Sequence, residues 1–177
     1  MNPLDIIRTY YPPNSKAYQI LLAHSEAVTN KAIELAEKHP EISLDISFIE
    51  EAAMLHDIGI FQTNAPDIDC HGKLPYICHG YAGAELLRNA GYPRHALVCE
   101  RHTGSGITMD TIQTRNLPLP LRDMCPISLE EKLICYADKF FSKSQGKEKT
   151  LNQIRNEMLK FGQASLDRFN ALHTLFA

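Results

Sequence analysis

The stretch that decides the fold spans residues 52–61 and reads AAMLHDIGIF. It places His56 beside Asp57 inside an apolar run with helical spacing, and Gly59 follows two residues later. Gly59 predicts a left-handed cap that ends this helix. Asp57 would then lie in the last helical turn, where the helix macrodipole disfavours a carboxylate by about 0.3–1 kcal/mol. A bound cation would reverse that penalty, whereas the plainer interpretation is a surface aspartate beside a hydrogen-bonded core histidine.

Helix signals extend outward from this stretch in both directions. Ser47 followed by Glu50 has the spacing of a capping box, which predicts that the same helix begins near Phe48. Similar signals predict a short N-terminal helix and further helices at about residues 15–38, 80–90, 93–102, 128–141 and 150–176. Prolines without a clear period indicate long loops at residues 62–77 and 103–126, which are candidate pocket walls. No segment is typical of a strand, so the predicted fold class is all-α.

The composition limits the possible functions. The chain has 177 residues, of which 44% are hydrophobic, so we expect a single domain with a real core. The net charge is −3 and no basic block is visible, which argues against nucleic acid as a partner. The N-terminus does not resemble a signal peptide, and no apolar run approaches the roughly 18 residues of a membrane span. We therefore expect no membrane partner and a cytoplasmic location.

Several residues have weaker indications of a metal or structural role. The five cysteines form no CxxC pair, which predicts reduced thiols. Cys70 and His71 are minor candidates for metal ligands. His39 precedes a proline that ends a helix, so we expect it to be solvated, and we expect His95 and His173 to be structural.

A set of six polar side chains is predicted to lie on apolar helix faces. The six are His24, His56, Asp57, His79, His102 and Asp138. A single inward histidine is more often a hydrogen-bonded core residue than a ligand, and a buried aspartate is rare because an isolated buried charge is costly. Six such groups in one small domain instead favour a metal site, because neutral imidazoles and carboxylates suit Fe, Mn, Co, Ni or Zn. Six ligands exceed the needs of one tetrahedral ion, which indicates two divalent transition-metal ions.

The order and spacing of these residues resemble the HD superfamily of metal-dependent phosphohydrolases. HDIG at 56–59 matches the HDIG variant of that superfamily. Three further segments resemble a small, largely uncharacterised bacterial and archaeal HDIG branch: HGYAGAELLRNAG (79–91), ERHTGSGIT (100–108) and LEEKLICYADKF (129–140). The resemblance covers about residues 15–145. It implies an HD-domain-like helical bundle in which residues 1–177 form one HD domain with a C-terminal helical extension at about 150–176.

The resemblance also implies a ligand set and limits the substrate. It implies metal ligands at His24, His56, Asp57 and Asp138, and His79 and His102 match the subset of the superfamily that holds two metals. That subset includes cyclic-dinucleotide phosphodiesterases, symmetrical dinucleoside tetraphosphatases and di-iron oxygenases. The cyclic-dinucleotide branch carries a lysine soon after HD and a GYP motif. This chain has neither, which argues against a cyclic-dinucleotide substrate.

These observations favour a metal-dependent phosphohydrolase that acts on a small, nucleotide-like phosphoester or phosphoanhydride. Two cations about 3.5–4 Å apart would lower the pKa of a water between them and neutralise charge on phosphoryl oxygens. Asp57, which can use both oxygens, is the expected bridge and the catalytic carboxylate. Four basic residues near the motifs are expected to bind substrate phosphate: Lys73, Arg101, Lys139 and Lys143. The alternatives are a di-iron oxygenase resembling myo-inositol oxygenase and a non-catalytic, metal-containing binding module.

Overall fold

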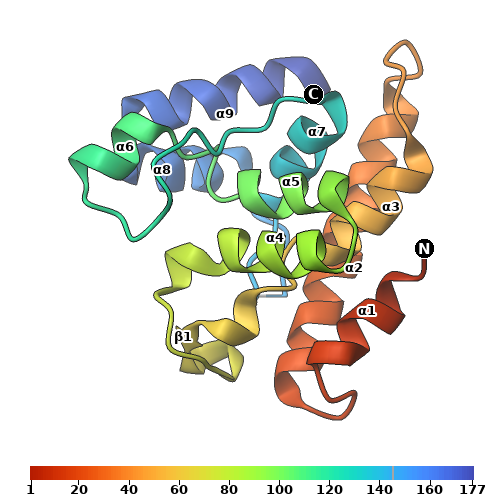
Figure 1. The fold of residues 1–177 in the computed structure, drawn as a ribbon. Helices are drawn as coiled ribbons and strands as arrows, with labels where there is room; N and C mark the ends of the chain where they lie inside the picture. The colour runs from red at the N-terminus through yellow and green to blue at the C-terminus, as the bar shows by residue number, and fades with distance from the viewer. Residues whose placement is uncertain (145) are drawn as a thin grey trace.

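The fold is a bundle of α-helices with very little strand (Figure 1). The computed structural model describes residues 1–144 and 146–177. The α-helices of this part of the chain are α1 (Pro3–Tyr10), α2 (Lys16–Lys38), α3 (Ile46–Leu55), α4 (His79–Asn89), α5 (Pro93–Arg101), α6 (Met109–Thr114), α7 (Leu129–Asp138), α8 (Leu151–Lys160) and α9 (Gln163–Phe176). The prediction of an all-α helical bundle is confirmed.

The long helix α2 organises the bundle. It packs against α3 and α7, while α4 packs against α5, and α5 contacts both α3 and α7. Figure 1 shows α9 lying along the side of α7 at one end of the molecule, and α1 lying near α2 and α3 at the other. Helices from distant parts of the sequence therefore meet around the middle of α2.

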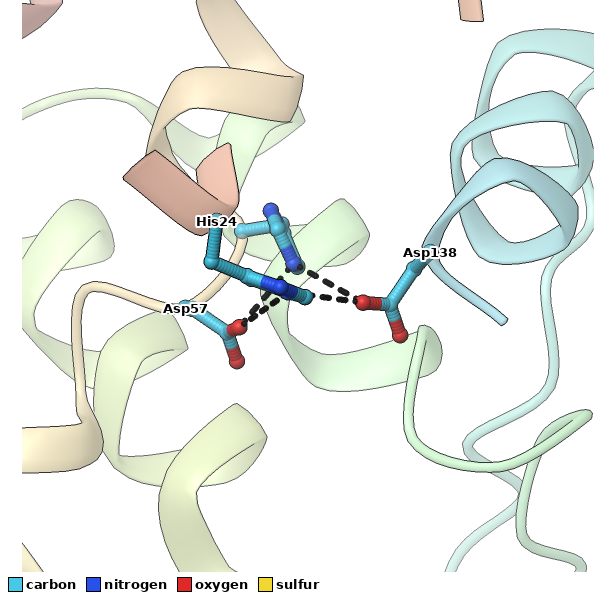
Figure 2. Close-up of side chains that lie close together, drawn as sticks. His24, Asp57 and Asp138 are labelled. Carbon is cyan, nitrogen blue, oxygen red and sulfur yellow. Dashed lines mark hydrogen bonds and ion pairs between the residues drawn. The ribbon is translucent and has the colours of Figure 1, made fainter. Parts of the chain in front are cut away.

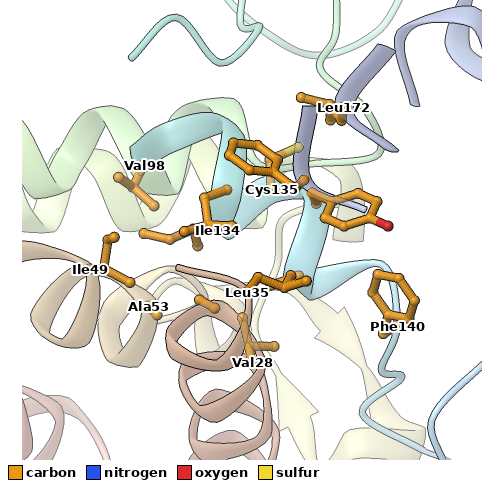
Figure 3. Packing of buried hydrophobic residues seen from close by; sticks show 14 of the residues in the cluster. Val28, Leu35, Ile49, Ala53, Val98, Ile134, Cys135, Phe140 and Leu172 are labelled. Atoms are coloured by element: carbon orange, nitrogen blue, oxygen red, sulfur yellow. The ribbon is translucent and has the colours of Figure 1, made fainter. Parts of the chain in front are cut away.

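Two apolar cores lie on either side of that middle region. The first is built by α2, α3, α5, α7, α8 and α9, and Figure 3 shows Val28, Ile49, Val98 and Leu172 converging in it. The second is built by α1, the N-terminal half of α2, the end of α3, α4 and α5. Leu21 belongs to the second core and Val28 to the first, so His24 lies on α2 between the two cores.

The helix that precedes His56 begins and ends differently from the prediction. Asp45 caps it, because its carboxylate accepts a hydrogen bond from the Phe48 amide at 3.0 Å. The predicted capping box of Ser47 and Glu50 is therefore wrong, since both residues lie inside α3. Gly59 is also not a left-handed cap, because its φ is −83°. The helix instead passes through His56 into a tight turn that continues as the 3₁₀-helix η1 (Ile60–Gln62).

Both predicted loops contain short elements. Residues 62–77 form a small antiparallel hairpin of β1 (Asn64–Ala65) and β2 (Cys70–His71), together with the 3₁₀-helices η2 (Pro66–Ile68) and η3 (Tyr76–Cys78). The second loop contains α6, and Thr108 is the N-cap residue of this helix. The predicted C-terminal helix is two helices, because Gly162 has a φ of +110° between α8 and α9. The hairpin, the 3₁₀-helices and α6 each have too few residues for a periodic pattern of apolar residues to be visible in the sequence.

The turn after Asp57 is held in place from two sides. On one side, Gly59 packs so closely on α4 that a Cβ at this position would lie 2.3 Å from the Gly83 nitrogen. On the other side, the hydroxyl of Tyr11 donates a hydrogen bond to the Ile58 carbonyl at 2.7 Å and accepts one from the Phe61 amide at 3.1 Å. Burial raises the pKa of Tyr11, so this phenol stays protonated and able to donate. The turn is therefore fixed relative to both α1 and α4.

We expect Gly59→Ala to destabilise the protein by about 3 kcal/mol, at the upper end of the usual cost of overpacking. The added methyl group would lie 2.3 Å from the His79 carbonyl oxygen as well as from Gly83, and both neighbours are backbone atoms that cannot rotate away. Urea denaturation measures the effect. Gly146→Ala is the matched control, because a Cβ there has no neighbour within 4 Å. Equal stability of the two variants would contradict the close packing.

Candidate metal centre

Six buried side chains meet where the helix ends converge on α2. His24 lies in the middle of α2, His56 caps the end of α3, and Asp57 follows it. His79 begins α4, His102 caps the end of α5, and Asp138 is the last residue of α7. All six have a relative exposure of 8% or less. Figure 2 shows His24, Asp57 and Asp138 pointing toward one another from separate parts of the chain.

Three of the histidines are oriented by the same hydrogen bond. The Nδ1 of His56, His79 and His102 lies 2.6, 2.7 and 2.8 Å from the backbone carbonyl oxygen of the residue three positions earlier. A carbonyl oxygen can only accept, so each Nδ1 carries a proton, and each ring in its neutral form presents the lone pair of Nε2. Histidines that bind metals usually donate their other ring N–H in this way.

One group of potential ligands lies on the α2 side of Asp57. The Nε2 atoms of His24 and His56 are each 3.1 Å from Oδ2 of Asp57. The same two atoms are 3.0 and 3.4 Å from Oδ1 of Asp138. These four residues offer ligand atoms that all lie within 4.8 Å of one another, which is close enough for one ion to contact them all.

A second group lies on the other side of Asp57. The Nε2 atoms of His79 and His102 are each 3.3 Å from Oδ1 of Asp57, and they are 3.1 Å from each other. Asp57 therefore belongs to both groups, with one oxygen facing each. This division suits a carboxylate that bridges two cations.

The second group fits a cation better than it fits the bare side chains. Burial lowers the pKa of His79 to about 3 and also lowers that of His102, so both rings are neutral at pH 7. Their Nε2 lone pairs then face each other, and both face Oδ1 of Asp57, which has no hydrogen-bond donor within the described residues. Three lone-pair donors at these distances repel one another. A divalent ion among them would turn this repulsion into coordination, and imidazole with carboxylate is a common ligand set for first-row metals.

Neighbouring charges strongly shift the pKa values of His56 and Asp57 in the first group. Burial opposes protonation of His56, but the charge of Asp57 and contact with Asp138 outweigh it and raise the pKa of His56 to about 10. Burial would raise the pKa of Asp57, yet the charges of Lys143 and His56 hold it well below its usual range. The carboxylates thus create a negative field that favours a positive charge, and a metal ion would replace the proton on His56.

Two of the predicted phosphate-binding residues lie beside this cluster. The Nζ of Lys143 is 2.6 Å from Oδ2 of Asp57, and the Nζ of Lys139 is 2.6 Å from Oδ2 of Asp138. Lys139 also donates a hydrogen bond to the His102 carbonyl at 3.0 Å. For Lys143, the charge of Asp57 outweighs the effect of burial and raises the pKa, so its ammonium stays charged.

The other two predicted phosphate-binding residues lie elsewhere. Lys73 is an exposed side chain beyond the β1–β2 hairpin, and it does not line the cavity over the cluster. Arg101 does not line that cavity either, and its guanidinium donates a hydrogen bond to Glu131 at 2.9 Å. The structure therefore does not bring Lys73 and Arg101 to this cavity, and a role for them in substrate binding stays a prediction.

The remaining histidines and Cys70 have ordinary partners. The Nδ1 of His39 lies 2.9 Å from Oε1 of Glu41, and the Nε2 of exposed His71 lies 3.1 Å from Oδ1 of Asp69. His95 has a carboxylate companion that the sequence did not suggest, since its Nε2 is 3.0 Å from Glu51. His173 accepts or donates a 2.8 Å hydrogen bond with the Tyr136 hydroxyl, and Cys70 donates to a backbone carbonyl. None of them joins a metal-like group in the part of the chain that the structure describes.

A cavity of about 620 Å³, the main pocket, opens over the cluster. Its floor contains His79, His102 and Asp138, and Lys139 and Lys143 also line it. The predicted loops supply part of the wall, through Ala65, Asp67, Ile68, Tyr76 and Ile77 of the first and Thr103 and Gly104 of the second. Much of the rest comes from residues 141–144 and from α8, which the sequence did not indicate as a wall.

The sequence analysis also missed the aromatic side chains of the main pocket. Tyr76 stacks on the His79 ring, with centroids 4.6 Å apart and planes 24° apart, and 40% of Tyr76 is exposed. Phe161 lies at the end of α8 and is 54% exposed. Tyr76 could have been suspected, because it precedes a candidate ligand by three residues. Phe161 carries no signal of its own in the sequence.

Comparison with known proteins agrees with these features. The model of the HD domain family matches residues 21–142. An uncharacterised protein of Methanocaldococcus jannaschii is 39% identical over 121 residues, which are 67% of this chain and 64% of that protein. Two proteins named tRNA (cytidine(56)-2'-O)-methyltransferase are also similar. The one from Picrophilus torridus is 34% identical over 73% of this chain and 33% of its own length.

The second, from Thermoplasma volcanium, is 29% identical over 96% of this chain and 44% of its own length. The chain thus spans less than two thirds of each of these curated relatives. No solved structure matches. Among the helices of residues 1–144 and 146–177, none is long and apolar enough to cross a membrane.

Proposed function

Because the chain belongs to the HD domain family, we propose that it is a metal-dependent phosphohydrolase acting on a small, nucleotide-like phosphoester or phosphoanhydride. The observation that carries the proposal is the pair of neutral imidazoles, His79 and His102, that face each other at 3.1 Å beside Asp57. An arrangement of lone pairs of this kind has no structural benefit without a cation.

The proposed ligands divide into two sets that share one carboxylate. His24, His56 and Asp138 would hold one cation with Asp57, and His79 and His102 would hold the other with the second oxygen of Asp57. When bound, two such ions supply an activated water and neutralise charge on the phosphoryl oxygens. Asp57 would be the catalytic residue in this scheme, because its carboxylate would hold both ions.

Lys139 and Lys143 would bind the phosphoryl group. Their ammonium groups contact the two carboxylates of the cluster and also line the main pocket. With cations neutralising Asp57 and Asp138, the positive charge of both lysines becomes available to a bound anion. The lysines thus link the cluster to the space in which a substrate would lie.

Chelation tests the proposal directly. We expect the purified protein to hydrolyse a generic phosphodiester or a member of a nucleotide panel, to lose this activity in EDTA, and to regain it when Mn²⁺, Co²⁺, Ni²⁺, Zn²⁺ or Fe²⁺ is added back. The measurement combines elemental analysis with phosphate release. Full turnover by protein that holds no metal would contradict the proposal.

Two other functions remain compatible with the ligand set. A di-iron oxygenase would contain iron alone, and its turnover would depend on oxygen. A metal-containing binding module would hold its ions but turn over no substrate in the panel. The two relatives named tRNA methyltransferases extend well beyond the part that this chain matches, so we keep the prediction that nucleic acid is not the partner and include an RNA oligonucleotide in the panel as a check.

A further inference from the structure

A second, smaller cavity adjoins the main pocket. It has a volume of about 170 Å³, and we call it the side pocket. Ile77, Thr103, Gly104 and Phe161 line both cavities. The two cavities therefore share a border at Phe161.

The side pocket is positively charged. Arg115 and Arg168 line it, and no aspartate or glutamate stands among its described lining residues. Neither arginine forms an ion pair with a carboxylate within residues 1–144 and 146–177, whereas Arg101 and Arg122 are paired with Glu131 and Glu100. Two guanidinium groups without a carboxylate partner in this part of the chain thus lie at one cavity. They favour an anionic ligand.

Backbone contacts hold both guanidinium groups at the edge of this cavity. Arg115 donates to the Phe161 carbonyl at 2.7 Å. Arg168 donates to the carbonyl oxygens of Ser105 and Gly106 at 3.3 and 3.1 Å. These bonds occupy only part of the five N–H donors that each guanidinium carries, so donors remain for a ligand. Because the side chains are already positioned, binding costs little additional side-chain entropy.

We propose that the side pocket is a second anion subsite and that the substrate is a nucleotide with two separated phosphate groups. The phosphate that reacts would lie at Lys139 and Lys143, the second phosphate would lie at Arg115 and Arg168, and the nucleoside between them would contact Phe161. The first placement rests on the proposed function. The second placement depends only on the arginines and on the shared border of the two cavities.

Calorimetry with two probes tests this inference. Adenosine 5′-monophosphate and adenosine 3′,5′-bisphosphate are titrated separately into the metal-loaded protein at low temperature, and chromatography verifies that each ligand stays intact. A charge-assisted hydrogen bond is strong enough that we expect the bisphosphate to bind at least about tenfold more tightly. In the double variant Arg115→Gln with Arg168→Gln, we expect this preference to fall to about twofold or less, with binding of the monophosphate unchanged.

Arg155→Gln is the matched control. Arg155 lies on α8, donates to Asn170 at 3.0 Å and lines neither cavity, so this variant should keep the full preference. If the double variant does not fold, Arg115→Gln alone carries the test, with an expected loss of about threefold in the preference. The inference is overturned if the wild-type protein shows no preference, binds neither nucleotide, or keeps its preference after substitution. A protein that prefers the bisphosphate but hydrolyses no phosphoester would leave the subsite in place and refute only the proposed function.

Discussion

Asp57→Ala protein is expected to retain almost no metal and no measurable hydrolysis. Asp57 belongs to both ligand groups, and each of its oxygens faces a different pair of imidazoles. Removing the carboxylate therefore removes a ligand from both ions at once. Loss of both ions removes several kcal/mol of transition-state stabilisation, so activity should fall by more than about 1000-fold. Elemental analysis and phosphate release measure the two effects on the same preparation.

Thermal unfolding distinguishes a metal role from a structural role. A ligand that binds only the folded state raises its melting temperature, so EDTA should lower the melting temperature of the wild-type protein but not that of Asp57→Ala. Asp167→Ala is the control, because Asp167 is exposed on α9, where its carboxylate accepts a hydrogen bond from the Gln163 side chain at 2.8 Å. An Asp57→Ala protein that stays metal-replete and active would refute the assignment.

The double substitution of His79 and His102 by alanine should lower the metal content from about two ions per chain to about one. His24, His56, Asp57 and Asp138 remain as a complete group for one ion. Hydrolysis should nevertheless fall steeply, because a single ion cannot stabilise both the attacking and the leaving oxygen. The protein should stay folded, since the substitution also removes the lone-pair repulsion between the two rings at 3.1 Å.

The competing interpretation predicts a different pair of results. If His79 and His102 were only core residues bonded to backbone carbonyls, the double variant would be less stable and its metal stoichiometry would be unchanged. The control replaces His95 and His173, two imidazoles that are hydrogen-bonded outside the cluster, to Glu51 and Tyr136. Elemental analysis and melting temperature of both double variants decide between the two interpretations.

The sequence was sufficient to predict the helices that carry the six residues of the cluster. Ser15 caps α2 and Ser128 caps α7, so both helices begin close to the predicted starts at about residues 15 and 128, because capping depends on neighbours within one turn. The six inward polar residues could be recognised for a similar reason, since the helical period alone shows which face a side chain shares with its apolar neighbours. These predictions required no knowledge of how the helices pack.

Features that depend on packing were missed or wrong. Gly59 is required by the close approach of α4, which no pattern within residues 52–61 can show. Lys73 and Arg101 are near the motifs in sequence but do not line the main pocket, whereas Phe161 is distant in sequence and forms part of its wall. Hairpin β1–β2 and α6 are too short for periodicity to identify.

The burial of side chains in the first and last helices determines which residues a truncated or fused version of this fold must include. The family match covers residues 21–142, yet Ile7 and Tyr11 before it and Phe169 and Phe176 after it are all at most 1% exposed. Full burial of one such side chain stabilises a protein by about 1.5–3 kcal/mol, so four of them approach a typical total stability of about 5–15 kcal/mol. We infer that a fusion protein containing only residues 21–142 would expose apolar side chains of both cores to solvent. The smallest stable fragment therefore includes α1 and α9.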